Sequence, residues 1–204
     1  MTAMAGEKWI DGSLTKRIIV GISGASGAVY GVRTLEFLRK AGVESHLVIS
    51  RAAKITLAHE TSFKVADVEA LASHVYRSED IGAAISSGSY PTMGMIVAPC
   101  SIRSLSEIAT GVTSSLLSRA ADVCLKERRR LVLVVRETPL HAGHLTNMLA
   151  VTQMGGVISP PVPAFYAKPT SLDDMIDHTV GRALDLFDID VGMVRRWKAD
   201  DSEV

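Results

Sequence analysis

The stretch VGISGASGAVYG, residues 20–31, decides the fold, because it joins a predicted strand to a predicted helix with very little side chain between them. Residues 17–23 (RIIVGIS) are short and β-branched, which predicts a buried strand. Residues 28–40 carry apolar side chains at helical spacing. Such a glycine-rich turn lets backbone N–H groups approach an anion, often a phosphate, although a tight turn without a ligand is the alternative.

Length and charge narrow the class of protein. The 204 residues suffice for one sizeable α/β domain. We expect residues 17–204 to form it and residues 1–16 to be a flexible extension. Lys+Arg and Asp+Glu both number 22, and this zero net charge argues against a nucleic-acid-binding surface. The sequence has no membrane-length apolar run and no secretory signal, so we expect a cytoplasmic protein, in keeping with only two cysteines.

Strands and helices alternate along the chain. Strands are predicted at residues 17–23, 44–50, 94–99, 131–135 and 157–159. Helices are predicted at residues 28–40, 51–60, 65–74, 102–128 with an interruption near residues 110–111, 145–154 and 172–187. This alternation predicts an α/β fold with a parallel, doubly wound sheet, in which ligands bind beyond the carboxyl ends of the strands.

The glycine spacing favours a mononucleotide over a dinucleotide. Glycines at 21, 24 and 27 give G-x-x-G-x-x-G, whereas the dinucleotide fingerprint is G-x-G-x-x-G followed by an acidic residue. The second predicted strand ends in Ser50 instead of an acid, so the ribose of NAD lacks its usual anchor. We therefore expect one phosphate near the turn, with hydroxyls from Ser26 and Ser50.

Four segments together carry a specific family pattern. They are GISGASGAVYG (21–31), PCSIRSLSEIATG (99–111), RAADVCLKERRRLVLVVRETPLH (119–141) and PPVPAFYAKP (160–169). Over about residues 16–198 the chain resembles the UbiX/Pad1 family of flavin prenyltransferases, within the homo-oligomeric flavin-containing Cys decarboxylases. The resemblance implies a Rossmann-like, flavodoxin-type three-layer αβα sandwich, usually assembled as a dodecamer with FMN between subunits.

The resemblance also implies an activity. Members transfer a dimethylallyl group from dimethylallyl phosphate to N5 and C6 of reduced FMN. The product, prenylated FMN, passes to a UbiD-type decarboxylase. The transfer needs no metal, and neither nucleic acid nor a membrane is expected as a partner.

Site residues follow from the positions that match the family. FMN is expected to contact Gly24, Ala25, Ser26, Ser50, Ser101, Ile102, Arg103, Ser104 and Arg136. Dimethylallyl phosphate is expected to contact Arg119, Lys126, Tyr166 and Arg182. Catalytic roles near the reacting centre fall to Glu60, Lys126 and Glu137. Ile81 stands where some relatives carry tryptophan, so we expect an aliphatic wall in the prenyl pocket.

Two other functions remain as alternatives to prenyl transfer. A flavin-dependent cysteine decarboxylase is disfavoured by the PCSIRS turn and by Glu60, where that branch expects an Asn-rich turn and a histidine. An FMN-binding accessory subunit of an aromatic-acid decarboxylase is the third possibility.

Cys100 follows a predicted strand, but nothing near it in sequence activates a thiolate, so we expect a buried structural residue. His141 and His144 form H-x-x-H without an evident third ligand, so no metal site is expected there.

Overall fold

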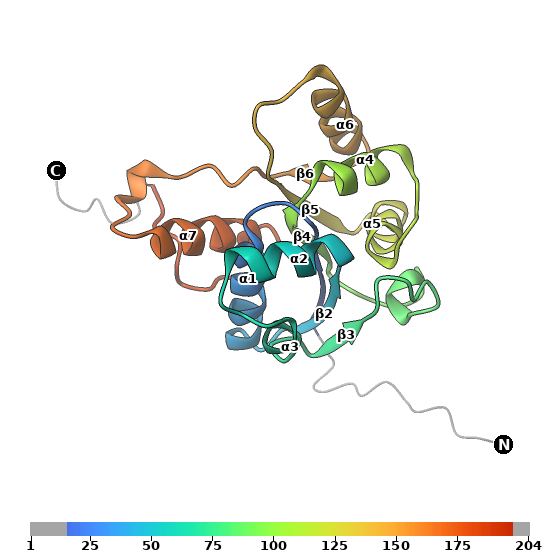
Figure 1. Cartoon of the computed structure of the whole chain (residues 1–204), viewed down its shortest axis with the longest axis horizontal. Helices are drawn as coiled ribbons and strands as arrows, with labels where there is room; N and C mark the ends of the chain where they lie inside the picture. Colours follow the sequence, from blue (N-terminus) through green and yellow to red (C-terminus); the bar gives the residue numbers. More distant parts are fainter. Residues whose placement is uncertain (1–15, 198–204) are drawn as a thin grey trace.

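A computed structural model describes residues 16–197, and the expected extension at residues 1–16 lies outside this range apart from Lys16. Within the described residues, six strands form one sheet in the order β3-β2-β1-β4-β5-β6, and each pair of neighbours is parallel (Figure 1). The strands are β1 (Arg17–Ile22), β2 (Glu44–Ile49), β3 (His74–Tyr76), β4 (Gly94–Cys100), β5 (Arg130–Val135) and β6 (Val157–Ile158).

Helices cover both faces of this sheet. They are α1 (Ala28–Lys40), α2 (Arg51–Glu60), α3 (Val65–Glu69), α4 (Ile102–Thr110), α5 (Leu116–Lys126), α6 (Ala142–Gln153) and α7 (Leu172–Asp185), with 3₁₀ turns η1 (Ala84–Ser86) and η2 (Phe165–Ala167). One apolar core joins the sheet to α1, α2, α3 and α7, and a second joins its other face to α4, α5 and α6. The predicted three-layer sandwich is therefore confirmed (Figure 1).

Most elements lie where the sequence predicts them, and α2 matches its predicted range. The predicted helix over residues 65–74 is wrong beyond Glu69, because His74–Tyr76 form the edge strand β3. Tertiary pairing decides this short segment: His74 lies opposite His46 and Tyr76 opposite Val48 of β2. The interruption predicted near Gly111 is confirmed, since this residue ends α4 with φ of 71°.

Packing explains most of the glycines in the deciding stretch. Gly27 has φ of +99°, a left-handed conformation that L side chains rarely adopt, immediately before α1. A Cβ on Gly31 would lie 2.5 Å from the Ala98 carbonyl oxygen of β4 and 2.7 Å from Ile22. A Cβ on Gly24 would collide with Ala52 of α2. The glycines thus bring α1 and α2 close to the sheet, and they shape the turn at the carboxyl end of β1.

Within residues 16–197, no helix combines the length and the apolar character needed to cross a lipid bilayer.

Candidate functional site

Buried hydrogen bonds join the carboxyl ends of β1 and β4. The Ser23 hydroxyl donates to the Pro99 carbonyl oxygen at 2.9 Å and accepts from the Ser101 amide at 2.7 Å. Ser23 is almost completely buried, so each of these bonds forms away from competing water. This link fixes the 24–27 turn after β1 against the start of α4, which carries the SIRS segment.

A cavity of about 420 Å³ opens beside this link, which we call the serine-capped cavity. Its lining includes Ser50, Ser101 and Ser115, and these residues are the N-caps of α2, α4 and α5. Each hydroxyl accepts a hydrogen bond from the backbone N–H three residues further on. Because the N-terminus of a helix carries partial positive charge, three such ends around one cavity favour an anion.

The rim of the serine-capped cavity carries equal numbers of basic and acidic side chains. Arg51 and Arg103 line it together with Glu79 and Glu107. The Arg103 Nε lies 2.9 Å from the Glu107 carboxylate, although the Arg103 side chain is 83% exposed. The helix ends, rather than an excess of basic side chains, therefore supply the local preference for a negative group.

A second hollow of about 380 Å³, which we call the arginine cleft, lies on the other side of the 24–27 turn. Gly24 contributes to the serine-capped cavity, whereas Ser26 and Gly27 contribute to this one. Arg136 and Glu137 enter from the carboxyl end of β5. The remaining lining is largely apolar: Val29, Tyr30, Val135, Pro160, Pro161, Val162, Leu172 and Ile176. The cleft thus combines one basic and one acidic side chain with a surface suited to a flat, partly apolar ligand.

Glu60 closes the N-terminus of α1 from the end of α2. Its carboxylate accepts hydrogen bonds from the amides of Gly27 at 2.7 Å and Ala28 at 3.1 Å. Partial burial opposes ionisation, but hydrogen bonds from Ser26 and these amides, with the nearby Arg136 charge, hold the pKa of Glu60 below its usual range. Glu60 is therefore ionised at neutral pH, between the turn and Arg136.

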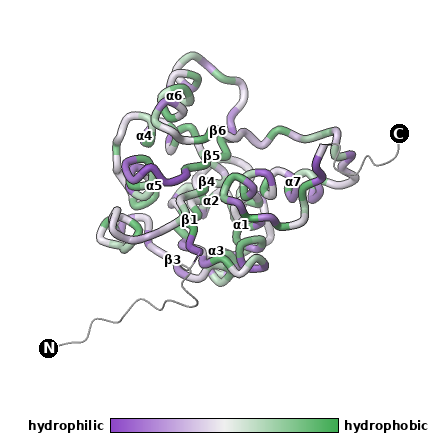
Figure 2. Tube along the Cα trace, turned by 180° about the vertical axis from the view of Figure 1, so that it is seen from behind, coloured by the Kyte–Doolittle hydropathy of each residue, from purple (hydrophilic) through white to green (hydrophobic). Residues whose placement is uncertain are grey.

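Arg119 and Lys126 lie along α5, outside both hollows. Arg119 donates from Nη1 to Asp122 at 2.6 Å and from Nε to the Ser86 carbonyl oxygen at 3.2 Å. Lys126 ends the helix and pairs with Glu127. It begins the hydrophilic segment that leads into β5, seen in Figure 2 between the α5 and β5 labels.

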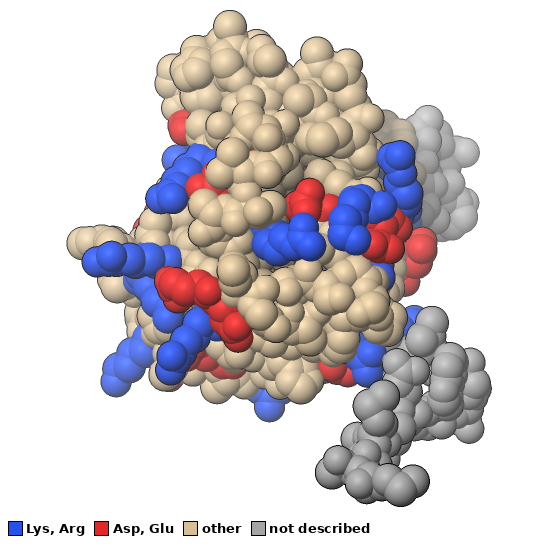
Figure 3. All heavy atoms as spheres, turned by 90° about the vertical axis from the view of Figure 1, so that its right-hand side faces the viewer, with Lys and Arg blue, Asp and Glu red and all other residues tan. Residues whose placement is uncertain are grey.

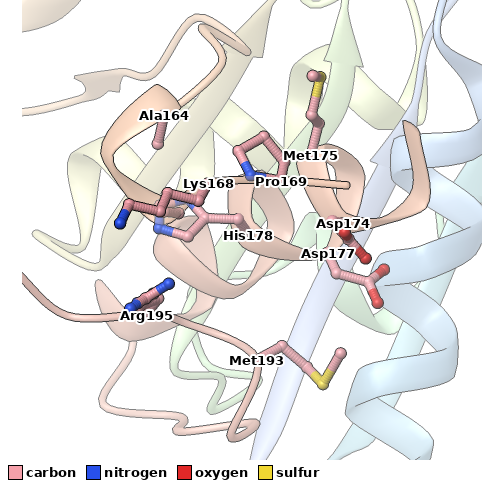
Figure 4. A pocket seen from close by; sticks show the side chains of 10 residues that line it. Ala164, Lys168, Pro169, Asp174, Met175, Asp177, His178, Met193 and Arg195 are labelled. Atoms are coloured by element: carbon pink, nitrogen blue, oxygen red, sulfur yellow. The ribbon is translucent and has the colours of Figure 1, made fainter. Parts of the chain in front are cut away.

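Tyr166 and Arg182 lie around α7. The Tyr166 hydroxyl is 3.4 Å from Nε2 of His178, and its ring meets Trp197 edge-on with centroids 5.5 Å apart. Arg182, one turn after His178, donates to Asp185 at 2.6 Å. A small hollow of about 150 Å³ opens here, with Lys168, His178 and Arg195 on one side and Asp174 and Asp177 on the other (Figure 4).

The two hollows at the carboxyl edge bring together eight of the predicted residues: Gly24, Ser26, Ser50, Ser101, Arg103, Ser104, Arg136 and Glu137. Ala25 is buried and Ile102 packs against the core. Within this chain, none of the four predicted prenyl-phosphate residues lines either hollow. They also form two separate pairs, because α5 and α7 cover opposite faces of the sheet. Ile81 is 66% exposed and lines neither hollow within this chain.

Two residues that line the arginine cleft or the serine-capped cavity were not predicted from the sequence. Tyr30 lies in the arginine cleft, where burial raises its pKa and the Arg136 charge partly opposes the shift. Ser115 caps α5 and lines the serine-capped cavity. The only signal for Ser115 is its place before a helical pattern with Ser118 three residues later, which indicates a capping box but not a ligand.

The cysteines are structural, as expected for Cys100. Burial raises the pKa of Cys100 to about 12, and burial also raises the pKa of Cys124 to about 12. Neither thiol is ionised at neutral pH, so neither supplies a thiolate nucleophile.

The fold and the carboxyl-edge hollows define a doubly wound α/β protein of the nucleotide-binding kind. The family model described as Flavoprotein matches residues 11–184. A flavin prenyltransferase UbiX of Salmonella typhimurium is 59% identical over 186 residues, covering 90% of this chain and 98% of that protein.

Solved structures agree with this match. AnUbiX in complex with FMN and dimethylallyl pyrophosphate has a TM-score of 0.89 and 53% identity, covering 90% of this chain and 98% of that one. A dodecameric FMN-dependent UbiX-like decarboxylase from Escherichia coli O157:H7 has a TM-score of 0.87 and 49% identity, covering 89% and 99%. The chain belongs to the UbiX family of flavin prenyltransferases.

Proposed function

We propose that this protein transfers a dimethylallyl group from dimethylallyl phosphate to N5 and C6 of reduced FMN, forming prenylated FMN. The observation that carries the proposal is the pair of hollows on either side of the 24–27 turn. One is bordered by three helix N-termini and the other by Arg136, Glu137 and apolar side chains. A phosphate and a flat ring system fit such neighbouring sites, and AnUbiX was solved with FMN.

FMN would place its phosphate in the serine-capped cavity and its ring system toward the arginine cleft. The volumes of about 420 and 380 Å³ lie within the usual range for small-molecule sites, roughly 300–1,000 Å³. The N-terminus of α1 is already bound by Glu60 through two backbone amides. The ends of α2, α4 and α5 are therefore the better phosphate site.

The allylic phosphate would bind basic side chains contributed by more than one copy of the chain. Arg119 and Lys126 belong to α5, whereas Tyr166 and Arg182 lie around α7 on the opposite face of the sheet. One copy alone thus separates the two pairs. A homo-oligomer, on the pattern of the dodecameric relative, would bring one copy's α5 to the edge of another copy's site.

The surface of α6 supports such an assembly. On the face drawn in Figure 3, the upper part of the molecule, where α6 lies, is almost free of Lys, Arg, Asp and Glu, and α6 itself contains none of them. Four large apolar side chains in and beside this helix are exposed: Leu140, Leu145, Leu149 and Met154. A contiguous uncharged surface of this kind suits contact between subunits.

The residues then have separate chemical roles. Breaking the allylic C–O bond leaves negative charge on the phosphate, which Arg119, Lys126 and Arg182 would stabilise. Reduced FMN, when bound, would supply the electron-rich N5 and C6 to which the allyl group is joined. Glu60, which is ionised and interacts with the Arg136 charge, and Glu137 would accept or hold a proton near the ring system. Prenylated FMN would then pass to a UbiD-type decarboxylase.

Anaerobic incubation with reduced FMN and dimethylallyl phosphate tests the proposal. We expect a flavin whose mass rises by one C5 unit, detected by mass spectrometry of the extracted flavin. A parallel reaction with dimethylallyl pyrophosphate identifies which phosphoester the pocket accepts. Unmodified flavin from both reactions, with tight FMN binding intact, would contradict the transfer and support the accessory-subunit function instead.

A further inference from the structure

A cluster of titratable side chains lies at the amino edge of the sheet, away from the carboxyl-edge hollows. Glu44 and His46 are two residues apart on β2 and share one face of the sheet. His74 on β3 lies directly opposite His46 in the parallel register. Among the described residues, these three form the one group of histidine, cysteine and acidic side chains with metal-ligand geometry.

The three ligand atoms already converge. Oε1 of Glu44 lies 3.0 Å from Nε2 of His46 and 3.1 Å from Nε2 of His74, and the three atoms all lie within 4.8 Å of one another. The His46 and His74 rings stack with centroids 4.7 Å apart. A tetrahedral zinc site needs its ligand atoms only slightly further apart, because each sits about 2.0–2.2 Å from the metal.

Outer partners hold these side chains in place. The Tyr76 hydroxyl lies 2.9 Å from Nδ1 of His46, and Nε of Arg17 lies 3.3 Å from the other carboxylate oxygen of Glu44. A metal-binding histidine usually donates its second ring N–H to such a partner, which fixes the tautomer and the ring orientation. Here Tyr76 would accept the Nδ1 proton while Nε2 faces the metal.

The environment keeps His46 available as a ligand. Its side chain is fully buried, and its ring stacks on the rings of His74 and Tyr76, which fixes its orientation. Because the Arg17 charge offsets the Glu44 charge, the site attracts a cation such as Mg²⁺, which depends on oxygen ligands, only weakly. The two imidazoles instead suit a metal such as Zn²⁺.

We propose that Glu44, His46 and His74 form a zinc site at the amino edge of the sheet. Two imidazoles and one carboxylate are a known zinc ligand set, with the fourth position left to water. His74 is about half exposed, so the metal has a path from solvent. The site is independent of prenyl transfer, because its residues line neither carboxyl-edge hollow. Its chemical alternative is a carboxylate that accepts hydrogen bonds from two imidazole N–H groups without any metal.

Titration of the metal-free full-length protein with Zn²⁺ near pH 7.5, measured by calorimetry, distinguishes a zinc site from a metal-free hydrogen-bonded cluster. We expect saturable binding of one Zn²⁺ per chain, and Mg²⁺ in excess should not compete. His74→Ala removes an exposed ligand and Glu44→Gln keeps the side-chain shape, so both variants should fold. Each should weaken Zn²⁺ binding at least about tenfold. Loss of a residue that only hydrogen-bonds to a metal ligand already costs about that much affinity, and loss of a ligand should cost no less.

His144→Ala is the matched control, because His141 and His144 form a second histidine pair with ring centroids 3.6 Å apart. It should bind Zn²⁺ like the unaltered protein. Co²⁺ adds a direct readout, since four-coordinate Co²⁺ absorbs in the visible range, and this absorption should appear in the unaltered protein and be lost in His74→Ala. No saturable Zn²⁺ binding, binding unchanged in His74→Ala, or binding lost in His144→Ala would each overturn the proposal.

Discussion

Glu60 occupies the anion-binding end of α1 that a glycine-rich turn would otherwise offer to a phosphate. Its carboxylate accepts from Gly27 and Ala28 across the turn. A carboxylate from elsewhere in the chain thus stabilises a helix N-terminus that has no side-chain cap of its own. One consequence is that the proposed flavin phosphate would bind next to α2, α4 and α5, and another is that Glu60 should contribute to stability.

This contribution depends on pH. Because the pKa of Glu60 is lower in the folded protein than its ordinary value of 4.5, the carboxylate stabilises the fold above that pH and the effect is lost as the pH falls toward the folded pKa. Glu60→Gln should lower the free energy of unfolding by up to about 1 kcal/mol at pH 7, since the group is largely solvated. Urea unfolding at pH 7 and below pH 4.5 measures the difference. A difference that grew at low pH would contradict the assignment.

Arg136 and Lys126 should separate flavin binding from use of the allylic phosphate. Arg136 enters the arginine cleft beside Glu60, whereas Lys126 lies at the far end of α5. Arg136→Ala should raise the Kd for FMN at least about tenfold, the loss typical of a hydrogen bond to a charged group. Lys126→Ala should leave this Kd unchanged and reduce prenylated product. Flavin fluorescence measures the first effect and mass spectrometry the second; equal effects of both variants on Kd would contradict this division of the site.

At the scale of elements, close packing of α1 on the sheet depends on Gly31. A Cβ there would approach Ala98 and Ile22 to within 2.7 Å or less. Gly31→Ala should therefore destabilise the protein by about 1–3 kcal/mol through overpacking. Gly82→Ala is the control, because its Cβ would meet only Asp80 at 3.6 Å. Urea midpoints of the two variants test this, and a neutral Gly31→Ala would show that α1 can move away from the sheet without cost.

Local patterns predicted the elements that have long runs or clear caps. The strands β1 and β5 are visible in sequence because both of their faces are buried, which gives continuous β-branched runs. The helix α1 is visible because its buried residues recur at helical spacing. The strand β3 is not, since three residues contain too little pattern and only pairing with β2 defines them. The same pairing places His74 against His46, 28 residues away, so the cluster with Glu44 has no local signal.

The residues of the candidate functional site can be predicted from sequence only where they directly follow a strand. The residues that follow strands, such as Gly24, Ser101 and Arg136, meet at the carboxyl edge because parallel strands end together. Lys126 and Arg182 lie on helices, and no local pattern tells which copy of the chain they serve. Their placement on opposite faces of the sheet appears only in the folded structure.

At the scale of the whole molecule, this separation would make assembly part of the proposed function. One chain holds the serine-capped cavity and the arginine cleft, but it holds the proposed phosphate-binding pairs apart on α5 and α7. On the proposed function, a complete site would take Lys126 from one copy and Arg182 from another. Two variants that are each inactive should consequently repair one another when their chains assemble together.

The most direct test of this account is prenyl transfer by mixed oligomers of Lys126→Ala and Arg182→Ala chains, produced by co-expression with two different tags. Each variant alone should form little prenylated FMN. Random assortment of equal amounts leaves about one quarter of the sites with both side chains intact, so doubly tagged oligomers should recover about that fraction of the activity. Doubly tagged oligomers as inactive as either variant alone would show that both residues act from the same copy, contrary to the account.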